Sequence, residues 1–414
     1  GVMSPVRVLI APEGYAGLLA PAEAAAAIAR GWSLGAPHDS IEVLPVSDGG
    51  PGFIDTVARA LGGEVQVVMV DDPWGRPTPA TMLVSTDGAT VYLEAAQAGG
   101  GQVQQPGFGA QATQATHSPD GTAGDDPAAA SSGGVGDLLE AALRLRPRRI
   151  VLGLTGSLVL DAGLGMLGRL IPDQPSTAAG RAALSGGAAH LVLLRAENLG
   201  ALDRLIGRFV VTQLVALGDL HQPLLGLAGV AATHGPALGA DPEHAQLIEA
   251  ALGHAVDLVR RARPERRDLL SGTSVRLDRQ PGAGAGAGLG FGLAVLGAAL
   301  RDGATEGPQV VGLAQAVARA DLVVTGSTIL GWEALRSSAS AAVAHAAQEG
   351  GIPAIALCGR VEAGRRETMA AGYSGTYAVA SSLATWPAFA ADPARALAVR
   401  AESVARTWSP PTPA

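Results

Sequence analysis

Val6-Arg-Val-Leu-Ile10 begins the part of the sequence that decides the fold. This short apolar run predicts a strand, and residues 20–31 predict a helix with Pro21 in its first turn, where proline is tolerated. Ile41-Glu-Val-Leu-Pro-Val46 predicts a second strand, which leads into the loop Ser47-Asp-Gly-Gly-Pro-Gly52. Strand, helix, strand and loop in this order predict a doubly wound parallel sheet with its functional site at the carboxyl ends of the strands.

Short buried strands return near the other end of the chain. Asp321-Leu-Val-Val-Thr325 is rich in β-branched residues and ends at Gly326, and residues 354–357 form a similar apolar run. Residues 340–349 predict a helix between these two strands. A strand, a glycine turn and then a helix can present backbone N–H groups to an anion in α/β proteins.

The middle of the chain follows another pattern. Residues 65–70 and 90–94 predict hairpin-like strands, and residues 98–130 lack periodicity, which predicts a flexible loop. We therefore expect two domains. One is a discontinuous flavodoxin-like or Rossmann-like α/β domain of residues 1–68 plus 285–414, and the other is an inserted α/β domain of residues 69–284.

The composition restricts the class of protein. The chain has 414 residues and a net charge of −8, which argues against a nucleic-acid-binding surface. All 29 basic residues are arginine, so no mechanism can use a lysine amine. The apolar run at residues 281–300 is glycine-rich and favours a buried loop leading into a helix over a membrane span. With one cysteine, Cys358, and no signal segment, we expect a cytoplasmic protein without a membrane association.

Segments along nearly the whole chain, taken in order, resemble the type I glycerate kinases (glycerate 2-kinases). The matching segments are Ile10-Ala-Pro12, Pro45-Val-Ser-Asp-Gly-Gly-Pro-Gly52, Asp72-Pro-Trp-Gly75, Leu93-Glu-Ala-Ala96, Gly134-Val-Gly-Asp-Leu-Leu139, Gly156-Ser157 with Asp161-Ala-Gly-Leu-Gly-Met166, Gln222-Pro-Leu-Leu-Gly226, the glycine run from Pro281 to Gly290, and Leu322-Val-Val-Thr-Gly326. The resemblance implies a two-domain fold with the active site in the cleft between the domains. It also implies Mg-ATP as cosubstrate and D-glycerate as acceptor.

Several positions depart from the family's pattern. The family's first loop has Asp-Ser and a lysine where this chain has Glu13, Gly14 and Ala16, and its Asp-Gly-Gly-Glu-Gly has Pro51 here. Other positions where polar or charged family residues are replaced are Ala130, Ser131, Val135, Leu158, Val159, Leu160, Gln222, Leu238, Ser327, Thr328, Ile329, Gly331, Arg336, Ser337 and Ser338. Phosphoryl transfer depends on positioned cations and metal, so these departures predict a site without ATP or Mg²⁺ and without any other cofactor or metal cluster.

The same departures predict an apolar pocket for a small, largely apolar substrate. Candidate substrate-binding residues are Tyr15, Leu158, Leu160, His234, Ile329, Leu330, Trp332 and Arg336. Candidate acid–base residues are Glu13, Asp48, Asp161 and His221, because a carboxyl group in an apolar cleft can titrate near neutral pH. Asp48 and Asp161 have a structural alternative in helix capping or loop hydrogen bonding, and His221 and His234 have one as hydrogen-bonded structural histidines.

Three hypotheses follow. The first is an enzyme of the glycerate kinase fold that catalyses a cyclisation, isomerisation or elimination in specialised metabolism instead of phosphoryl transfer. The second is a non-catalytic pseudokinase that binds a ligand, and the third is a residual ATP-dependent kinase with an altered substrate. A homodimer remains open under all three.

Overall fold

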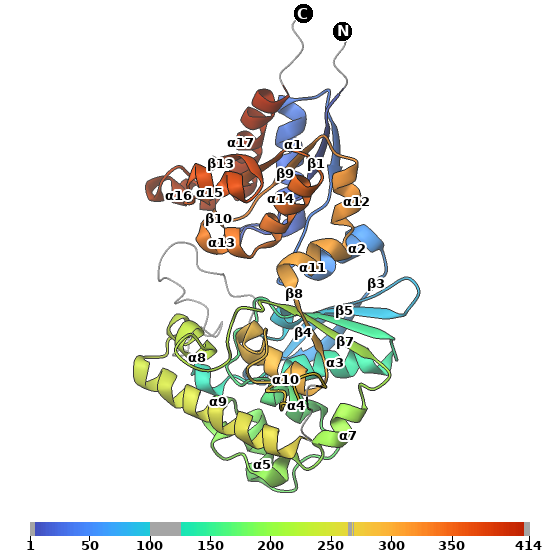
Figure 1. The fold of residues 1–414 in the computed structure, drawn as a ribbon, viewed down its shortest axis with the longest axis vertical. Helices are drawn as coiled ribbons and strands as arrows, with labels where there is room; N and C mark the ends of the chain where they lie inside the picture. Colours follow the sequence, from blue (N-terminus) through green and yellow to red (C-terminus); the bar gives the residue numbers. More distant parts are fainter. Residues whose placement is uncertain (1–4, 100–125, 264–266, 268, 410–414) are drawn as a thin grey trace, which may run out of the picture. The chain divides into compact units, whose positions relative to one another are not determined.

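A computed structural model describes residues 5–99, 126–263, 267 and 269–409 (Figure 1). The chain divides into two compact units. The terminal unit comprises Gly1–Gly62 and Gly303–Ala414, and the inserted unit comprises Gly63–Asp302. Each unit has a β-sheet of its own, so the two are described separately.

The terminal unit is built on a five-stranded parallel sheet of order β13-β11-β9-β1-β2. The strands are β1 (Arg7–Ile10), β2 (Ser40–Val43), β9 (Leu322–Thr325), β11 (Ala354–Cys358) and β13 (Tyr373–Ala378). The chain winds outward from β1 to β2 on one side and from β9 to β13 on the other, as in flavodoxin-like folds. The strand order therefore reverses between β1 and β9, and ligand sites of such sheets lie at the carboxyl ends of the strands at that point.

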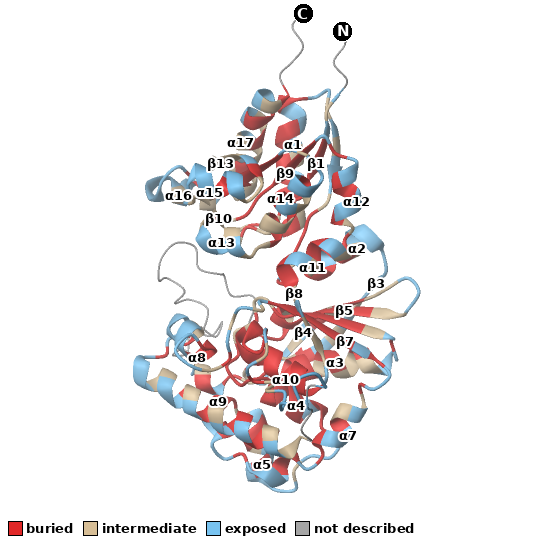
Figure 2. Cartoon of the chain, in the orientation of Figure 1, coloured by how far each residue is buried: buried red, intermediate tan, exposed pale blue. Residues whose placement is uncertain are grey.

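Helices cover both faces of this sheet. The helices of this unit are α1 (Pro21–Gly35), α2 (Phe53–Leu61), α11 (Gly303–Val310), α12 (Leu313–Ala318), α13 (Trp332–Arg336), α14 (Ala339–Glu349), α15 (Arg365–Ala370), α16 (Trp386–Ala391) and α17 (Pro393–Trp408). Two further strands, β10 (Ile329–Leu330) and β12 (Arg360–Val361), form a short parallel pair. Helices α1 and α17 pack against each other, and a Cβ at Gly31 would lie only 2.0 Å from the Ala398 carbonyl oxygen. Ile28, Trp32 and Leu397 fill the core beside β1, and α1 and α17 each alternate between buried red and exposed pale blue segments in Figure 2.

The inserted unit has a six-stranded mixed sheet of order β3-β4-β5-β6-β7-β8. The strands are β3 (Glu64–Asp71), β4 (Pro77–Val84), β5 (Thr90–Glu94), β6 (Arg149–Gly153), β7 (Gln213–Gly218) and β8 (Ala299–Asp302). Strands β3 to β5 are antiparallel neighbours, and β5 to β8 are parallel. The sequence patterns predicted strands at residues 65–70 and 90–94, which correspond to β3 and β5, but missed β4, because its prolines weaken the strand signal.

The helices of the inserted unit enclose one large core. They are α3 (Gly133–Arg144), α4 (Leu164–Leu170), α5 (Ala178–Ser185), α6 (Ala188–Leu191), α7 (Leu202–Gly207), α8 (Val230–His234), α9 (Pro242–Ala262) and α10 (Leu289–Val295). The glycine run before α10 is buried, as expected for a loop leading into a helix. Among the described residues, no helix combines the length and the apolar character needed to cross a membrane.

The domain boundaries predicted from sequence need correction. The predicted limits at residues 68/69 and 284/285 fall inside β3 and ahead of β8, whereas the units divide at residues 62/63 and 302/303. The physical reason is that β3 and β8 are the two edge strands of the inserted sheet and are hydrogen-bonded to it. Of the predicted flexible loop at residues 98–130, the part from 100 to 125 lies outside the described residues.

Candidate functional site

Glu13 lies at the reversal point of the terminal sheet. Its loop follows β1, and its backbone N–H donates to the Gly326 carbonyl oxygen just after β9, with N and O 3.1 Å apart. The Glu13 carboxylate accepts a hydrogen bond from the Ser340 backbone N–H in the first turn of α14, at 3.1 Å. The side chain therefore caps a helix at the same place where the sheet topology predicts a ligand site.

The pKa of Glu13 is far above its usual range. Burial and, to a smaller extent, the charge of Asp48 raise it, the backbone N–H groups of Ser340 and Ala339 oppose the rise, and the resulting pKa is about 8. Glu13 as a whole residue is half-buried. With a pKa of about 8, the Glu13 carboxyl group is mostly protonated at neutral pH.

Asp48 is positioned by its own loop after β2. Its Oδ1 accepts from the Gly50 backbone N–H at 3.0 Å, and the Ser47 hydroxyl oxygen accepts from the Gly49 N–H at 3.2 Å. Helix α11 packs directly on this loop, since a Cβ at Gly307 would lie 1.8 Å from the Ser47 carbonyl oxygen. The position of Asp48 thus depends on a glycine far away in the sequence.

Replacing Gly307 by alanine is expected to destabilise the protein by about 2 kcal/mol, because the methyl group must displace the Ser47 backbone. The melting temperature measured by calorimetry checks this. Gly253→Ala in α9 is the matched control, since a Cβ there meets nothing within 4 Å and should leave stability unchanged or slightly raised. Equal melting temperatures for Gly307→Ala and the wild type would contradict the packing argument.

Polar groups surround the loop after β9. The Ala16 backbone N–H donates to the Thr328 hydroxyl oxygen at 2.7 Å, which ties the loop after β1 to the loop after β9. The buried Ser327 hydroxyl lies 3.7 Å from the Cys358 sulfur. Burial raises the pKa of the Cys358 thiol to about 11, so this cysteine is a neutral thiol at physiological pH.

The residues of the terminal unit that were predicted to bind substrate differ in how far they are buried. Tyr15 is fully buried, its hydroxyl donates to the Leu357 carbonyl oxygen, and its ring packs edge-on against Phe389. It therefore belongs to the core, and the prediction that it binds substrate is corrected. Leu330 is also fully buried, and Ile329 is half-buried. Trp332 is 75% exposed in α13, and Arg336 is exposed at the end of the same helix. Of the apolar set, Trp332 alone offers a large free surface.

Asp161 of the inserted unit is an internal anchor. Its carboxylate accepts from the Ser132 backbone N–H at 2.8 Å and hydroxyl at 2.9 Å, from Gly163 N–H at 2.9 Å and from Gly165 N–H at 3.1 Å. Burial raises the pKa of Asp161, and these donors oppose the rise. The side chain is 1% exposed. These contacts are those of a capping residue, which was the structural alternative for Asp161. The prediction that Asp161 is catalytic is therefore wrong, because no face of the carboxylate is open.

The other candidate site residues of the inserted unit are not joined to one another by any contact among the described residues. Leu160 is fully buried in the core, and Leu158 is half-buried against it, because the strand-end loop turns inward. His221 is exposed, and its backbone N–H donates to Asp219. Burial lowers the pKa of the half-buried His234, so this histidine is neutral at physiological pH.

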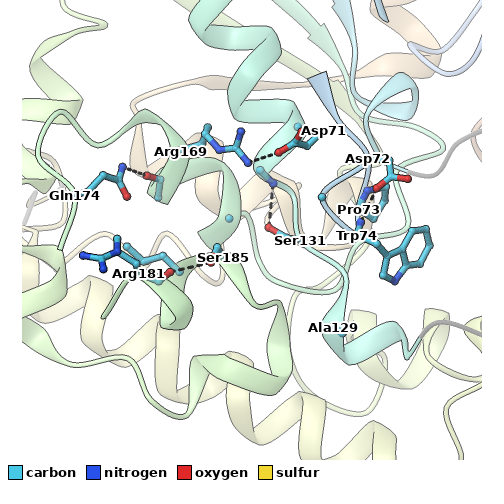
Figure 3. A pocket seen from close by; sticks show the side chains of 16 residues that line it. Asp71, Asp72, Pro73, Trp74, Ala129, Ser131, Arg169, Gln174, Arg181 and Ser185 are labelled. Atoms are coloured by element: carbon cyan, nitrogen blue, oxygen red, sulfur yellow. Dashed lines mark hydrogen bonds and ion pairs between the residues drawn. The ribbon is translucent and has the colours of Figure 1, made fainter. Parts of the chain in front are cut away.

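A cavity of about 560 Å³ in the inserted unit was not predicted from the sequence (Figure 3). It is lined by Trp74 from the β3–β4 turn, Ser131 before α3, Arg169 in α4 and Arg181 in α5. Asp72-Pro-Trp-Gly75 was noted as a motif, but the segment that holds Arg181 carries no recognisable pattern. Only the folded chain brings these separate segments together.

Comparison with known proteins identifies the chain. A model of the glycerate kinase family matches residues 8–409. This chain belongs to the glycerate kinase family.

Individual relatives agree with the family match. An uncharacterized protein of Mycobacterium bovis is 33% identical over 401 residues, which cover 97% of this chain and 91% of that protein. A glycerate kinase of Bacillus subtilis is 27% identical, covering 86% of this chain and 85% of that protein. The crystal structure of a putative glycerate kinase 2 from Salmonella typhimurium LT2 has a TM-score of 0.71 and 27% identity, and covers 98% of each chain.

Family membership confirms the resemblance and the α/β fold expected from the sequence. The glycerate kinase family is a family of enzymes, so the scaffold is an enzyme scaffold. The predicted position of the site between domains and the predicted site residues stay predictions. The departures at Glu13, Ala16 and Ser327 are departures within a glycerate kinase family member.

Proposed function

We propose that this glycerate kinase family protein is an acid–base enzyme that works through Glu13 and Asp48 rather than a phosphoryl transferase. The observation that carries the proposal is the Glu13 carboxyl group, which lies at the reversal point of the terminal sheet beside Asp48. A carboxyl group that holds its proton at neutral pH can donate it to a substrate, and a neighbouring carboxylate can accept one.

The two carboxyl groups suit a reaction that moves a proton within one substrate. In such a step Glu13 gives its proton to the atom that gains electron density, and Asp48 takes a proton from the neighbouring atom. Proton-shift isomerisations, eliminations of water in which Glu13 protonates the leaving oxygen, and acid-catalysed ring closures can use this pairing. The exposed indole of Trp332 supports a substrate with an apolar part, because it follows the loop that Thr328 ties to Ala16.

The residues present do not match a magnesium–nucleotide complex. Mg²⁺ is bound through ionised carboxylates and phosphates, but one Glu13 oxygen faces the first turn of α14 and the group is protonated at neutral pH. Among the described residues, no group of three or more His, Cys, Asp or Glu side chains is arranged to hold a metal ion.

Deuterium incorporation tests the proposal. A small-molecule extract of the source organism is incubated in D₂O with the wild type or with Glu13→Gln, and mass spectrometry follows metabolites that gain one deuterium or lose water. We expect at least one metabolite to change with the wild type and its conversion to fall by about 100-fold with Glu13→Gln. Glu333→Gln, on an exposed helix of the same unit, is the control. Equal conversion by Glu13→Gln and the wild type would refute the role of Glu13.

A glycerate-type kinase is the second candidate, and the relatives named glycerate kinase favour it. ADP release with Mg-ATP and D-glycerate separates the two. Acid–base catalysis without phosphoryl transfer predicts no ADP above the ATP background. Saturable ADP release that depends on D-glycerate would establish the kinase instead.

A further inference from the structure

Strand β3 forms one edge of the inserted sheet, and its outer side is open. Within the part of the chain that the structure describes, β4 is the only strand that pairs with it. The strand Glu64–Asp71 is eight residues long, pairs with β4 without a bulge, contains no proline and carries charge only at its two ends. Edge strands are usually protected by central charges, prolines, bulges or a covering segment, because their free backbone groups can pair with another strand.

The backbone groups that face outward belong to every second residue of β3. In an antiparallel pair of strands, hydrogen-bonded and non-hydrogen-bonded residue pairs alternate. The Asp71 N–H donates to the Asp137 carboxylate at 2.9 Å instead of to β4, so Asp71 is in a non-hydrogen-bonded pair. Counting back from Asp71, the N–H and C=O groups of Val65, Val67 and Met69 also point away from β4, and they have no partner among the described residues.

The same three residues expose apolar side chains. Val65 is 51% exposed, Val67 is 69% exposed and Met69 is 63% exposed, and alternation places all three on one face of β3. The other face is packed, with Val70 inside the core of the unit and Val68 against it. An apolar stripe of alternate residues beside free backbone groups is the surface that a further strand recognises.

We propose that β3 pairs with β3 of a second copy of this chain, antiparallel and about a twofold axis at Val67. The residues with outward backbone groups then lie opposite one another, Val67 opposite its own copy and Val65 opposite Met69. Each such pair exchanges two hydrogen bonds, which satisfies the free groups of both edges. The two apolar stripes meet on one face of the joined sheet, where cross-strand side chains stabilise the pairing.

The charges at the ends of β3 are compatible with this register. Glu64 lies opposite Val70 of the second copy, and Asp71 lies opposite Gly63, so no two carboxylates directly face each other. A second copy supplies the matching stripe by symmetry, because a twofold interface uses the same surface of both chains. A strand of another protein would need a matching stripe of its own.

Sedimentation velocity of the full chain over a range of protein concentrations tests the pairing. We expect a monomer–dimer equilibrium, and we expect Val67→Glu to weaken the dimer at least about tenfold, because it places two carboxylates opposite each other at the axis. Val67→Thr keeps a β-branched, uncharged side chain and should retain the dimer. Val43→Glu is the matched control, since Val43 is 44% exposed on β2, the edge strand of the terminal sheet, and its substitution should leave the dimer unchanged.

Amide hydrogen exchange of the wild type tests the register without any substitution. Exchange of the Val65, Val67 and Met69 amides should slow as the protein concentration rises, because these N–H groups become bonded only in the dimer. The amides of Gln66 and Val68 face β4 in both states and should show no such dependence.

A chain that stays monomeric, a dimer that Val67→Glu leaves intact, or a dimer without protection at the three outward amides would overturn the proposal. Val67 is exposed, so Val67→Glu should keep the circular dichroism spectrum and melting temperature of the wild type. The exchange measurement decides the question even if that variant does not fold. None of these readouts depends on Glu13, so failure here and failure of the proposed reaction are distinguishable.

Discussion

Replacing Asp161 by alanine is expected to lower the free energy of unfolding of the inserted unit by about 4 kcal/mol. The carboxylate accepts four hydrogen bonds, two of them from Ser132 and the others from Gly163 and Gly165. Alanine leaves these buried donors without an acceptor and opens a small void at the start of α4.

Urea denaturation and hydrogen exchange of the amides in β6 and α3 measure this loss. Asp173→Ala removes an exposed carboxylate paired with Arg204 and is the matched control, expected to cost at most about 1 kcal/mol. If Asp161→Ala does not fold, Asp161→Asn keeps one acceptor oxygen and should show a smaller destabilisation of the same kind. A loss below about 1 kcal/mol in either variant would contradict the anchoring role.

The second large effect is a pH dependence caused by Glu13. Its folded-state pKa of about 8 exceeds the ordinary value of 4.5, so the folded protein binds the proton more tightly than the unfolded chain. The stability that this proton contributes is fully present below about pH 4.5 and is lost as the pH rises through about 8. We expect Glu13→Gln to be more stable than the wild type at pH 8.5 by about 2–3 kcal/mol, a reduced value because Glu13 retains contact with solvent.

The difference in melting temperature between Glu13→Gln and the wild type, followed from pH 5 to pH 9, measures this effect. It should grow with pH to about 5–10 °C. The exposed Glu333→Gln should show no such trend. A difference that is constant over this range would show that Glu13 ionises normally, and it would remove the physical basis for its acid–base role.

Much of the fold could be predicted because its signals are local. The apolar runs at β1, β9 and β11 indicate short buried strands, and the helix predicted at residues 340–349 lies within α14. The alternation of strands and helices then predicts a parallel sheet. Strand β4 was missed and the domain limits were misplaced, because hydrogen bonds to neighbouring strands decide where an edge strand belongs.

The candidate site could be predicted only in part. Glu13 and Asp48 were chosen as candidates because both follow strands, and parallel strands end at one edge of a sheet. Their role in a functional site stays a prediction. Burial of Tyr15, Leu160 and Asp161 could not be predicted from residue type, since a polar or aromatic side chain after a strand can face either a ligand or the core.

The sequence by itself determined the family, the α/β class, the absence of lysine chemistry and the two acidic groups at strand ends. The tertiary structure decided that Glu13 titrates near neutral pH, because burial and the neighbouring charge of Asp48 raise its pKa. It also decided that Asp161 is an anchor and that Trp74 and Arg181 share a cavity. Burial, charge proximity and cavity shape depend on residues distant in the sequence, and only the folded chain brings those residues together.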